Sequence, residues 1–361
     1  MLAFARMRSG LKIVVALILI VALLLGGLTV NFLRLGGQFR TLAPHFAGSC
    51  TALPMQASAA DIQIDRPRGI AYLSYLDRRS QFDGQAVLGT IMLLDLSLPE
   101  PRPRPALMDD PPNFRPHGLS LYRAGDGSER LFAISHPPGQ ANTIEVFEQG
   151  ATGAFKPIRS IRDELLRHPH ALLAVGPNQF YVVNDSGAAS DLGRAVETLL
   201  GRAISSLLFF DGEKMRVLDA GIASGTGIAM SLDGRQIFVS EASANRIRVY
   251  ARNPASGDLA LVDKIDIGSA AQTINLAGDG SLWIAAHPKA LALLRHFRDA
   301  AKRSPTQIFR LDAGATGAAR LKEIYLDNGE QLSAGSVAAA FGNEMLIGSV
   351  TERKLLRCRI P

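Results

Sequence analysis

The chain has 361 residues, of which 47% are hydrophobic and 20% are charged, so it can bury a core, and disorder is excluded as its main state. Its formal net charge is +6, but five basic residues and no acidic residue lie within the first 40 positions, which leaves about +1 (6 − 5) for the remainder. A body so close to neutral offers no electrostatic footprint for nucleic acid, and we expect no nucleic-acid partner.

An almost unbroken apolar run extends from Ile13 to Val30 and follows three basic residues. At 1.5 Å per residue, such a helix nearly spans a bilayer core of about 30 Å. The positive-inside bias predicts a cytoplasmic N-terminus (1–12), a transmembrane signal-anchor helix (13–33) and a stem (34–49), with the rest periplasmic or extracellular. A cleaved signal peptide, which would make the protein secreted, is the competing interpretation. The run exceeds the usual signal core of about 7–15 residues, and no convincing A-x-A site follows it.

Cys50 and Cys358 are the only cysteines and lie at the two ends of the exported part. An oxidising compartment favours a disulfide between them, and the chain-entropy model assigns such a bond about 5–6 kcal/mol of stabilisation. The alternative is two unrelated buried thiols. A disulfide would require the first and last strands to be neighbours.

One pattern recurs along residues 50–361: an apolar strand, a tight turn with Gly, Asp or Asn, and a second apolar strand that ends in a polar residue. Repeats at intervals of roughly 45–60 residues, all β with turn signals, predict an all-β, six-bladed β-propeller. Each copy would supply the inner strands of one four-stranded blade. Helical patterns are few, namely a short one at 161–168 and a longer one at 290–303. The copies are residues 65–74, 120–136, 174–185, 231–241, 276–287 and 340–350.

Polar residues at the ends of inner strands would line the central channel of such a propeller, where ligands usually bind. Carboxylate and amide oxygens that converge on an axis suit a hard cation such as calcium. For each residue alone, a capped turn or a strand-end hydrogen bond is the simpler explanation. The sequence has no G-x-S-x-G, C-x-x-C, P-loop or G-x-G-x-x-G motif. The candidates are Asp61, His117, His136, Asn184, Asp185 and His287.

Taken together, these segments resemble the paraoxonase/arylesterase family. Its members are calcium-dependent six-bladed propellers that hydrolyse lactones and aryl esters, and they are related to gluconolactonase-like and strictosidine-synthase-like propellers. The resemblance runs from the N-terminal apolar run to Ile360, and it implies a retained membrane anchor and a disulfide between the two cysteines. It rests on PHGLS (116–120), SHP (135–137), AVGP (174–177), ND (184–185), LW…HP (282–288) and GSVAAAFGNEMLIGSV (335–350).

The resemblance implies two calcium ions (Ca2+) in the channel. For the inner, structural ion, the corresponding ligands are Asp61, the carbonyl of Leu119 and Asp185. The outer, catalytic ion polarises the substrate carbonyl in this family, and of its five ligand positions only Asn184 matches. An ungapped count from the first cysteine would instead assign Asp61 to the outer ion, although the local pattern fits the inner one better. The outer positions that differ are Ala60, Thr226, Gln272 and Thr273.

These replacements remove both carboxylates from the outer set. One Asn, two Thr and one Gln do not compensate the desolvation of calcium, so we expect one structural ion and weak or no binding of the second. His117 and His136 match the family's proposed general base and its support, and His287 also follows the family pattern. The remaining histidines are expected to be surface or structural residues (His168 and His170) or to face solvent (His45 and His296).

Two functions follow as hypotheses. The first is a membrane-anchored hydrolase (an arylesterase or lactonase) that acts on a small ester or lactone, although the loss of outer ligands argues against full activity. The alternative is a non-catalytic propeller that binds a small ligand or a partner protein and holds a single structural calcium. Metal-free chemistry in the same channel is a third possibility that no residue positively marks.

Overall fold

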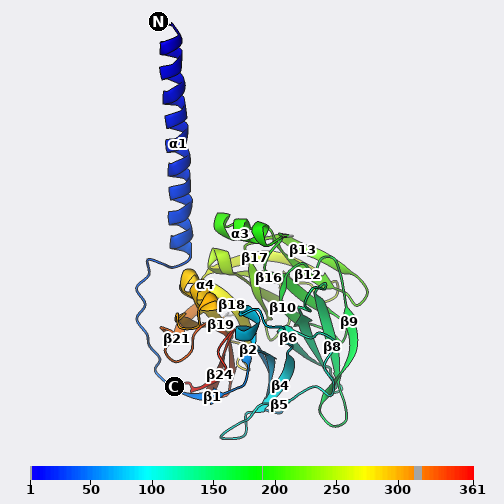
Figure 1. The fold of residues 1–361 in the computed structure, drawn as a ribbon. Coiled ribbons are helices and arrows are strands. Elements are labelled where there is room, and N and C mark those ends of the chain that lie inside the picture. Colours follow the sequence, from blue (N-terminus) through cyan, green and yellow to red (C-terminus); the bar gives the residue numbers. More distant parts are fainter. Residues whose placement is uncertain (1, 189, 313–318) are drawn as a thin grey trace.

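The computed structural model describes residues 2–188, 190–312 and 319–361. Within these ranges, 24 strands form six four-stranded antiparallel sheets, and Figure 1 shows these sheets arranged as blades around one axis. The innermost strand of each blade contacts the innermost strands of the two neighbouring blades, so the ring is continuous. The predicted six-bladed propeller is therefore confirmed.

The blades are built in chain order, with each strand hydrogen-bonded to the next. From the axis outward, the innermost strands are β2 (Ser58–Asp65), β6 (Pro116–Arg123), β10 (Pro169–Ala174), β14 (Gly225–Met230), β18 (Ala270–Leu276) and β22 (Gly335–Phe341). The second strands are β3 (Ile70–Leu76), β7 (Glu129–Ser135), β11 (Phe180–Asn184), β15 (Gln236–Glu241), β19 (Leu282–His287) and β23 (Glu344–Ser349).

The third strands are β4 (Thr90–Asp95), β8 (Thr143–Gln149), β12 (Ser205–Phe210), β16 (Arg246–Arg252), β20 (Thr306–Asp312) and β24 (Lys354–Arg359). The outermost strands are β5 (Arg104–Pro105), β9 (Phe155–Ile161), β13 (Met215–Ile222), β17 (Leu259–Asp266), β21 (Arg320–Asp327) and β1 (Ser49–Pro54). Second strands such as β11 and β19 are buried along their whole length, whereas β17 is mostly exposed. Burial thus decreases from the inner strands to the outermost strand of a blade. This decrease explains why continuous apolar runs in the sequence marked inner strands.

The ring is closed by strands from opposite ends of the chain. β1 pairs antiparallel with β24, so the N-terminal strand forms the outer edge of the C-terminal blade. In this pairing Cys50 lies directly opposite Cys358, and the two are joined by a disulfide. The predicted pairing of the cysteines is thereby confirmed.

Each innermost strand has an irregular register in the segment that faces the channel. Register shifts of this kind are β-bulges, which re-aim side chains locally and often occur beside binding sites. The shifts fall between Ala59 and Ile62, Pro116 and Leu119, Pro169 and Ala171, Gly225 and Ile228, Ala271 and Ile274, and Gly335 and Val337. Candidate site residues of five blades lie at or beside these bulges.

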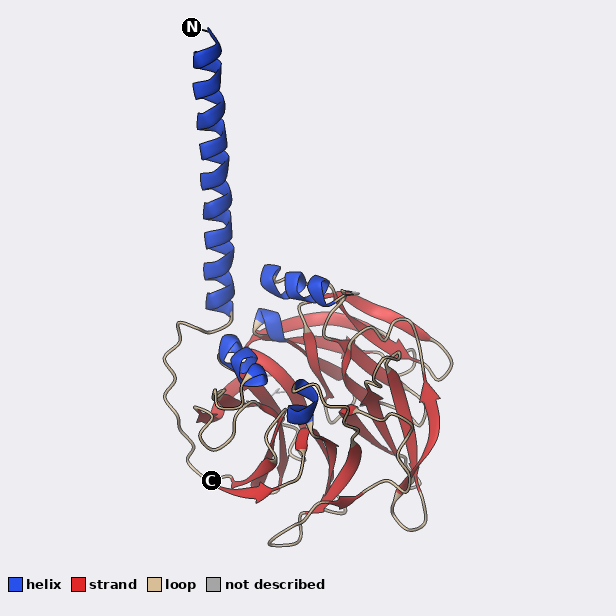
Figure 2. Ribbon diagram, viewed as in Figure 1, coloured by secondary structure: helices blue, strands red, loops and turns tan. Residues whose placement is uncertain are grey.

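Short helices follow the second strands of four blades. They are α2 (Arg78–Phe82) after β3, α3 (Asp191–Leu200) after β11, η1 (Ala242–Ala244) after β15 and α4 (Ala290–Arg298) after β19. Figure 2 shows the helices on the side of the propeller from which α1 (Leu2–Leu35) extends. The helical pattern at 290–303 is thus confirmed for α4.

The helical expectation at 161–168 is wrong. Ile161 ends β9, and the following residues form a turn in which Asp163 accepts hydrogen bonds from the backbone of Leu165 and Leu166. Pro169 begins the next strand, and a residue before proline is disfavoured in helical conformation.

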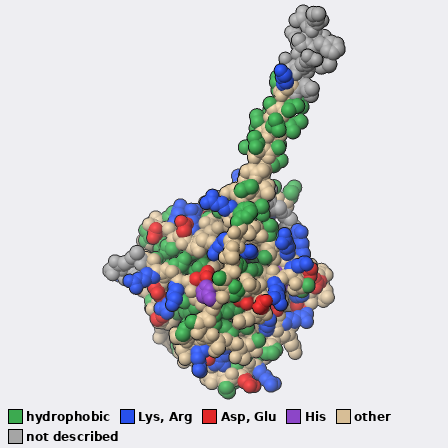
Figure 3. Space-filling view, turned by 90° about the vertical axis from the view of Figure 1, so that its left-hand side faces the viewer, with side chains coloured by type: hydrophobic (Ala, Val, Ile, Leu, Met, Phe, Trp, Pro, Cys, Tyr) green, Lys and Arg blue, Asp and Glu red, His purple; other side chains and the backbone are tan. Residues whose placement is uncertain are grey.

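The N-terminal helix includes one segment, Lys12–Leu35, that is long and apolar enough to cross a membrane, with a mean hydropathy of 3.1. Figure 3 shows hydrophobic side chains along this helix, while charged side chains of both signs are scattered over the propeller. The helix ends at Leu35 and is capped by Gly37, whose φ of 69° permits the hydrogen bond from Gln38 N to Leu33 O. The Ala290 N–H then donates to Gly36 O, which holds the end of α1 against α4.

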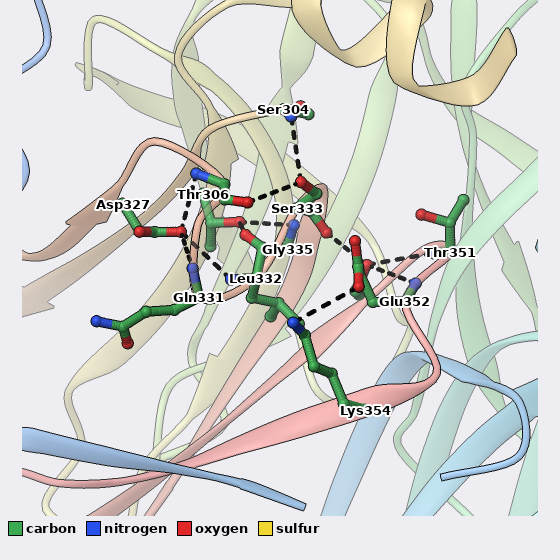
Figure 4. A network of polar contacts seen from close by, with 12 residues as sticks. Ser304, Thr306, Asp327, Gln331, Leu332, Ser333, Gly335, Thr351, Glu352 and Lys354 are labelled. Carbon is green, nitrogen blue, oxygen red and sulfur yellow. Dashed lines mark hydrogen bonds and ion pairs between the residues drawn. The ribbon is translucent and has the colours of Figure 1, made fainter. Parts of the chain in front are cut away.

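The seam between the fifth and sixth blades is sealed by polar contacts of the β21–β22 connection (Figure 4). One carboxylate oxygen of Asp327 accepts hydrogen bonds from the backbone N–H groups of Gly329, Gln331 and Leu332. Thr306 donates to Leu332 O at 2.6 Å and accepts from Gly335 N at 2.9 Å. These bonds satisfy buried backbone groups that water cannot reach.

We predict that the double variant Cys50→Ser/Cys358→Ser loses about 5 kcal/mol of its free energy of unfolding, because the unfolded chain regains the entropy of a loop closed over 308 residues. Urea titration of the full chain in detergent measures this loss. Reductant should lower the stability of the wild-type protein to that of the variant and leave the variant unchanged. Equal stabilities of the oxidised wild type and the variant would contradict the prediction.

Candidate active site

Three histidines meet in the channel. His117 lies on β6, His170 on β10 and His136 directly after β7. The ring of His117 is 5.3 Å from that of His136 and 4.4 Å from that of His170, measured between centroids. The predicted pair of His117 and His136 is thus brought together, and a third imidazole joins it.

Hydrogen bonds to carbonyl oxygens fix which nitrogen of each ring carries the proton. Because a carbonyl oxygen only accepts, Nδ1–H of His117 donates to His170 O (3.2 Å), and Nδ1–H of His170 donates to Thr226 O (2.7 Å). Nδ1–H of His136 donates to the amide oxygen of Asn142 at 2.7 Å, since the amide nitrogen of Asn142 is engaged with two backbone carbonyls. Each neutral ring therefore keeps the lone pair on Nε2.

Burial keeps these rings uncharged. Desolvation is the main cause that lowers the pKa of His117 well below its usual range, that of His136 to about 4, and that of His170 below its ordinary value. The nearby positive charge of Arg78 acts in the same direction on all three rings. A neutral imidazole can accept a proton, although so low a pKa makes His136 a weak base.

The ring of His170 connects Thr226 and Gln272, two residues that the resemblance led us to expect at an outer ion. Its Nδ1–H donates to the carbonyl of Thr226, and its Nε2 accepts from the side-chain amide of Gln272 at 3.0 Å. The backbone carbonyl of the same residue holds His117. His170 was expected to be a surface or structural residue, but it is only 9% exposed. Its position beside His117, the candidate base, was not foreseen.

The other polar side chains at the outer positions have partners within the protein. The amide of Asn184 donates to Leu165 O and Ser206 Oγ, and its oxygen accepts from His168 N. The hydroxyl of Thr226 donates to Ala271 O, and the hydroxyl of Thr273 donates to Ser336 O.

Asp61 is buried, whereas Asp185 is half-buried. Both oxygens of Asp61 accept backbone hydrogen bonds, from Ile62 N at 2.8 Å and from Leu119 N at 2.7 Å, and desolvation raises the pKa of Asp61 to about 7. Oδ1 of Asp185 is buried without a hydrogen-bond partner. Among the residues that the structure describes, no group of three or more His, Cys, Asp or Glu side chains is placed to hold a metal ion.

A cavity of about 20 Å³ lies in the channel, which is room for a single water molecule or ion. Its walls include Ala60, Asp61, His117, His170 and Thr273. A much larger hollow of about 710 Å³ lies along β1 and residues 100–103, and no channel histidine lines it. Of these two hollows, only the channel cavity is lined by His117 and His170.

Arg78 brings a positive charge into this site. It is 4% exposed, and its guanidinium donates to the neutral oxygens of Pro116, Ser58 and Ser74. Burial lowers its pKa to about 10, so it remains charged near neutral pH. The nearby negative group that partly offsets this burial is Asp61.

Sequence reasoning overlooked both Arg78 and His170, although signals for them exist. The Pro-His pair at 116–117 begins β6, and the same pair at 169–170 begins β10, the equivalent strand of the next blade. Arg78 follows the second strand of its blade, as His136 does. Equivalent places in successive blades converge on the axis.

Two further histidines, His287 and His296, are buried. His287 ends β19 as expected and is 4% exposed, and neither of its ring nitrogens has a hydrogen-bond partner. His296 was expected to face solvent but is 1% exposed, because its ring bonds to Lys302 O and to Thr351 Oγ1 beneath α4. His45 is exposed as expected, and His168 is half-buried.

This fold and this arrangement define a six-bladed β-propeller with a polar site in its central channel. The arylesterase family profile matches residues 59–360, and the chain belongs to that family. Serum paraoxonase/arylesterase 1 of Rattus norvegicus is 30% identical over 328 residues, which cover 88% of this chain and 90% of the relative. The Homo sapiens protein of the same name is 27% identical over 311 residues, covering 83% and 86%.

Solved structures agree on the fold alone. A luciferin-regenerating enzyme superposes with a TM-score of 0.53 at 11% identity, covering 87% of this chain and 95% of that one. A gluconolactonase from Xanthomonas campestris gives a TM-score of 0.50 at 14% identity, covering 88% and 94%.

We predict that His287 makes the protein less stable in acid. Desolvation lowers its folded-state pKa from 6.5 to about 4, so between these pH values the unfolded chain binds the proton more tightly. The contribution of His287 to the free energy of unfolding therefore falls by about 3 kcal/mol as the pH drops from 6.5 to 4. Below pH 4 this contribution stays constant. Urea titrations across this range should show a flatter pH profile for His287→Leu than for the wild type. The exposed-site control His45→Leu should keep the wild-type profile, and an unchanged profile for His287→Leu would contradict the prediction.

Proposed function

We propose that this chain is a membrane-anchored hydrolase that cleaves a small aryl ester or lactone in its central channel. The observation that carries the proposal is the pair of neutral imidazoles, His117 and His136, each held by Nδ1 with a lone pair left on Nε2. Membership of the arylesterase family supports the substrate class, and both relatives named above are called arylesterases.

In this proposal, Nε2 of His117 takes a proton from a water molecule as the water oxygen attacks the substrate carbonyl. The ring of His136 packs edge-on against this ring and supports its position. The negative charge that develops on the carbonyl oxygen is stabilised by the positive field of Arg78. The proton then returns to the leaving oxygen, so that an aryl ester gives a carboxylic acid and a phenol, whereas a lactone opens to a single hydroxy acid.

We also propose that the inner position holds one structural calcium ion. The donor set fits such an ion: Asp61 is a buried carboxylate whose pKa is raised by desolvation, and Asp185 offers an oxygen without a partner. Together with the carbonyl of Leu119 they would hold the ion and neutralise its charge. When bound, the ion would tie the first three blades together at the axis.

The second candidate is a propeller that binds a ligand without hydrolysing it. One observation favours it: the polar side chains at the outer positions already have protein partners, so the outer set does not fit a calcium ion. The channel then lacks the electrophile on which metal-assisted hydrolysis depends.

The segment Lys12–Leu35 supports membrane anchoring with the propeller outside the cytoplasm. The intact mass of the purified protein tests this, because a retained N-terminus argues for an anchor, and loss of the apolar run argues for a cleaved signal sequence.

We predict measurable hydrolysis of phenyl acetate or δ-valerolactone by the full chain in detergent. Replacing the base by His117→Gln should lower kcat/KM by about 10²–10⁴-fold, with little change in melting temperature. His45→Gln is the control and should keep full activity. Absence of turnover by the wild type, or unimpaired turnover by His117→Gln, would overturn the proposal in favour of the binding function.

We predict one tightly bound calcium per chain, measured by elemental analysis after dialysis against millimolar calcium. Asp61→Asn should lose this ion and the rise in melting temperature that calcium produces, whereas the exposed-site control Asp110→Asn should retain both. Two ions per chain in the wild type would show that the outer position binds calcium after all.

A further inference from the structure

We propose that the imidazole of His170 takes the place of the outer calcium ion, so that a side chain of the protein itself closes this position to cations. The inference concerns the same channel as the proposed function but does not require hydrolysis. Its basis is that the two ring nitrogens bond to two outer positions, Thr226 and Gln272, which belong to consecutive blades. The ring thus bridges strands that a shared ion would otherwise connect.

The first step is the loss of free oxygen ligands. Calcium takes six to eight oxygens at about 2.3–2.6 Å. The Thr226 carbonyl accepts the proton on His170, and the Thr226 hydroxyl is bonded to Ser240 and Ala271. The side-chain oxygen of Asn184 accepts a backbone N–H. These oxygens would have to break protein hydrogen bonds in order to bind an ion.

The second step is that the imidazole is itself fully satisfied. Its Nδ1–H has a carbonyl acceptor, and its Nε2 has an amide donor. A buried polar ring with both partners costs little to hold in place, whereas a divalent ion without carboxylates would be costly. The neutral set around this ring is therefore self-consistent without a metal.

The third step is space. Ala60 ends at Cβ, and the cavity between Ala60, Thr273 and His170 is about 20 Å³. That volume suits one water molecule beside the ring. A small residue at position 60 and a ring at position 170 therefore fit one another, as a pair of compensating replacements would.

The first test uses the unaltered full chain. In a spectrum of the protein with ¹⁵N-labelled histidine, assigned with His170→Ala, His170 should appear as the neutral Nδ1–H tautomer at neutral pH, with or without millimolar calcium. Gln272→Leu should shift the His170 Nε2 signal by removing its donor, and His168→Ala should not. A predominant Nε2–H tautomer, with or without calcium, would overturn the inference.

The second test restores the acidic and amide ligands by Ala60→Glu, Thr226→Asn, Gln272→Asp and Thr273→Asn, with and without His170→Ala. Calcium per chain is measured by elemental analysis. The quadruple variant that retains His170 should bind no more calcium than the wild type, and the variant that also carries His170→Ala should bind one additional ion. A second ion in the presence of His170 would overturn the inference.

The tests separate this inference from the proposed function. A chain that hydrolyses no ester but shows the Nδ1–H tautomer at His170 would refute hydrolysis and support the replacement of the ion. A chain that hydrolyses esters and gains an outer ion with His170 in place would support hydrolysis and refute the replacement of the ion. If the quadruple variants fail to fold, the spectrum of the unaltered chain still decides.

Discussion

The pairing of β1 with β24 is the constraint on which the rest of the structure depends. Blades pack only against their neighbours, so an open ring would leave two blade faces exposed and the channel without one wall. The antiparallel pairing and the disulfide between Cys50 and Cys358 prevent this opening. Because His117 and His170 come from neighbouring blades, the distance between their rings depends on how the blades pack in the closed ring.

Within the closed ring, the bulges decide what faces the axis. A regular strand would present every second residue to the channel, whereas a bulge lets one blade present a particular side chain at a particular height. His117 and His170 come from bulged segments at the start of neighbouring strands, and their rings therefore meet. Burial of the site then keeps these rings neutral. The positive charge in the site comes from Arg78 instead.

Much of the fold was predictable because strand pairs in a propeller carry strong local signals. Apolar runs flanked by turn residues located the second strand of every blade, although most of the predicted repeats begin at or after the end of the innermost strand. The cysteine positions indicated the closure. The site was predictable only in part. His117 and His136 lie at strand ends as predicted, whereas Asp61 lies inside β2 at a bulge. The contacts of His170 depend on a bulge and on the packing of three blades, which periodicity does not report. The segment 161–168 misled because its apolar spacing imitates a helix while the proline that follows favours a turn.

One residue in the channel performs two separable tasks. The backbone carbonyl of His170 fixes the tautomer of His117, while its side chain occupies the space next to that ring. A backbone carbonyl is present whatever the side chain, so a change of residue at this position leaves the orientation of the candidate base intact. A propeller of this kind can therefore exchange an ion for an organic group, or one organic group for another, by substitutions that never disturb the proton-transfer pair. Such decoupling gives the channel a route to new chemistry in small, individually tolerated steps.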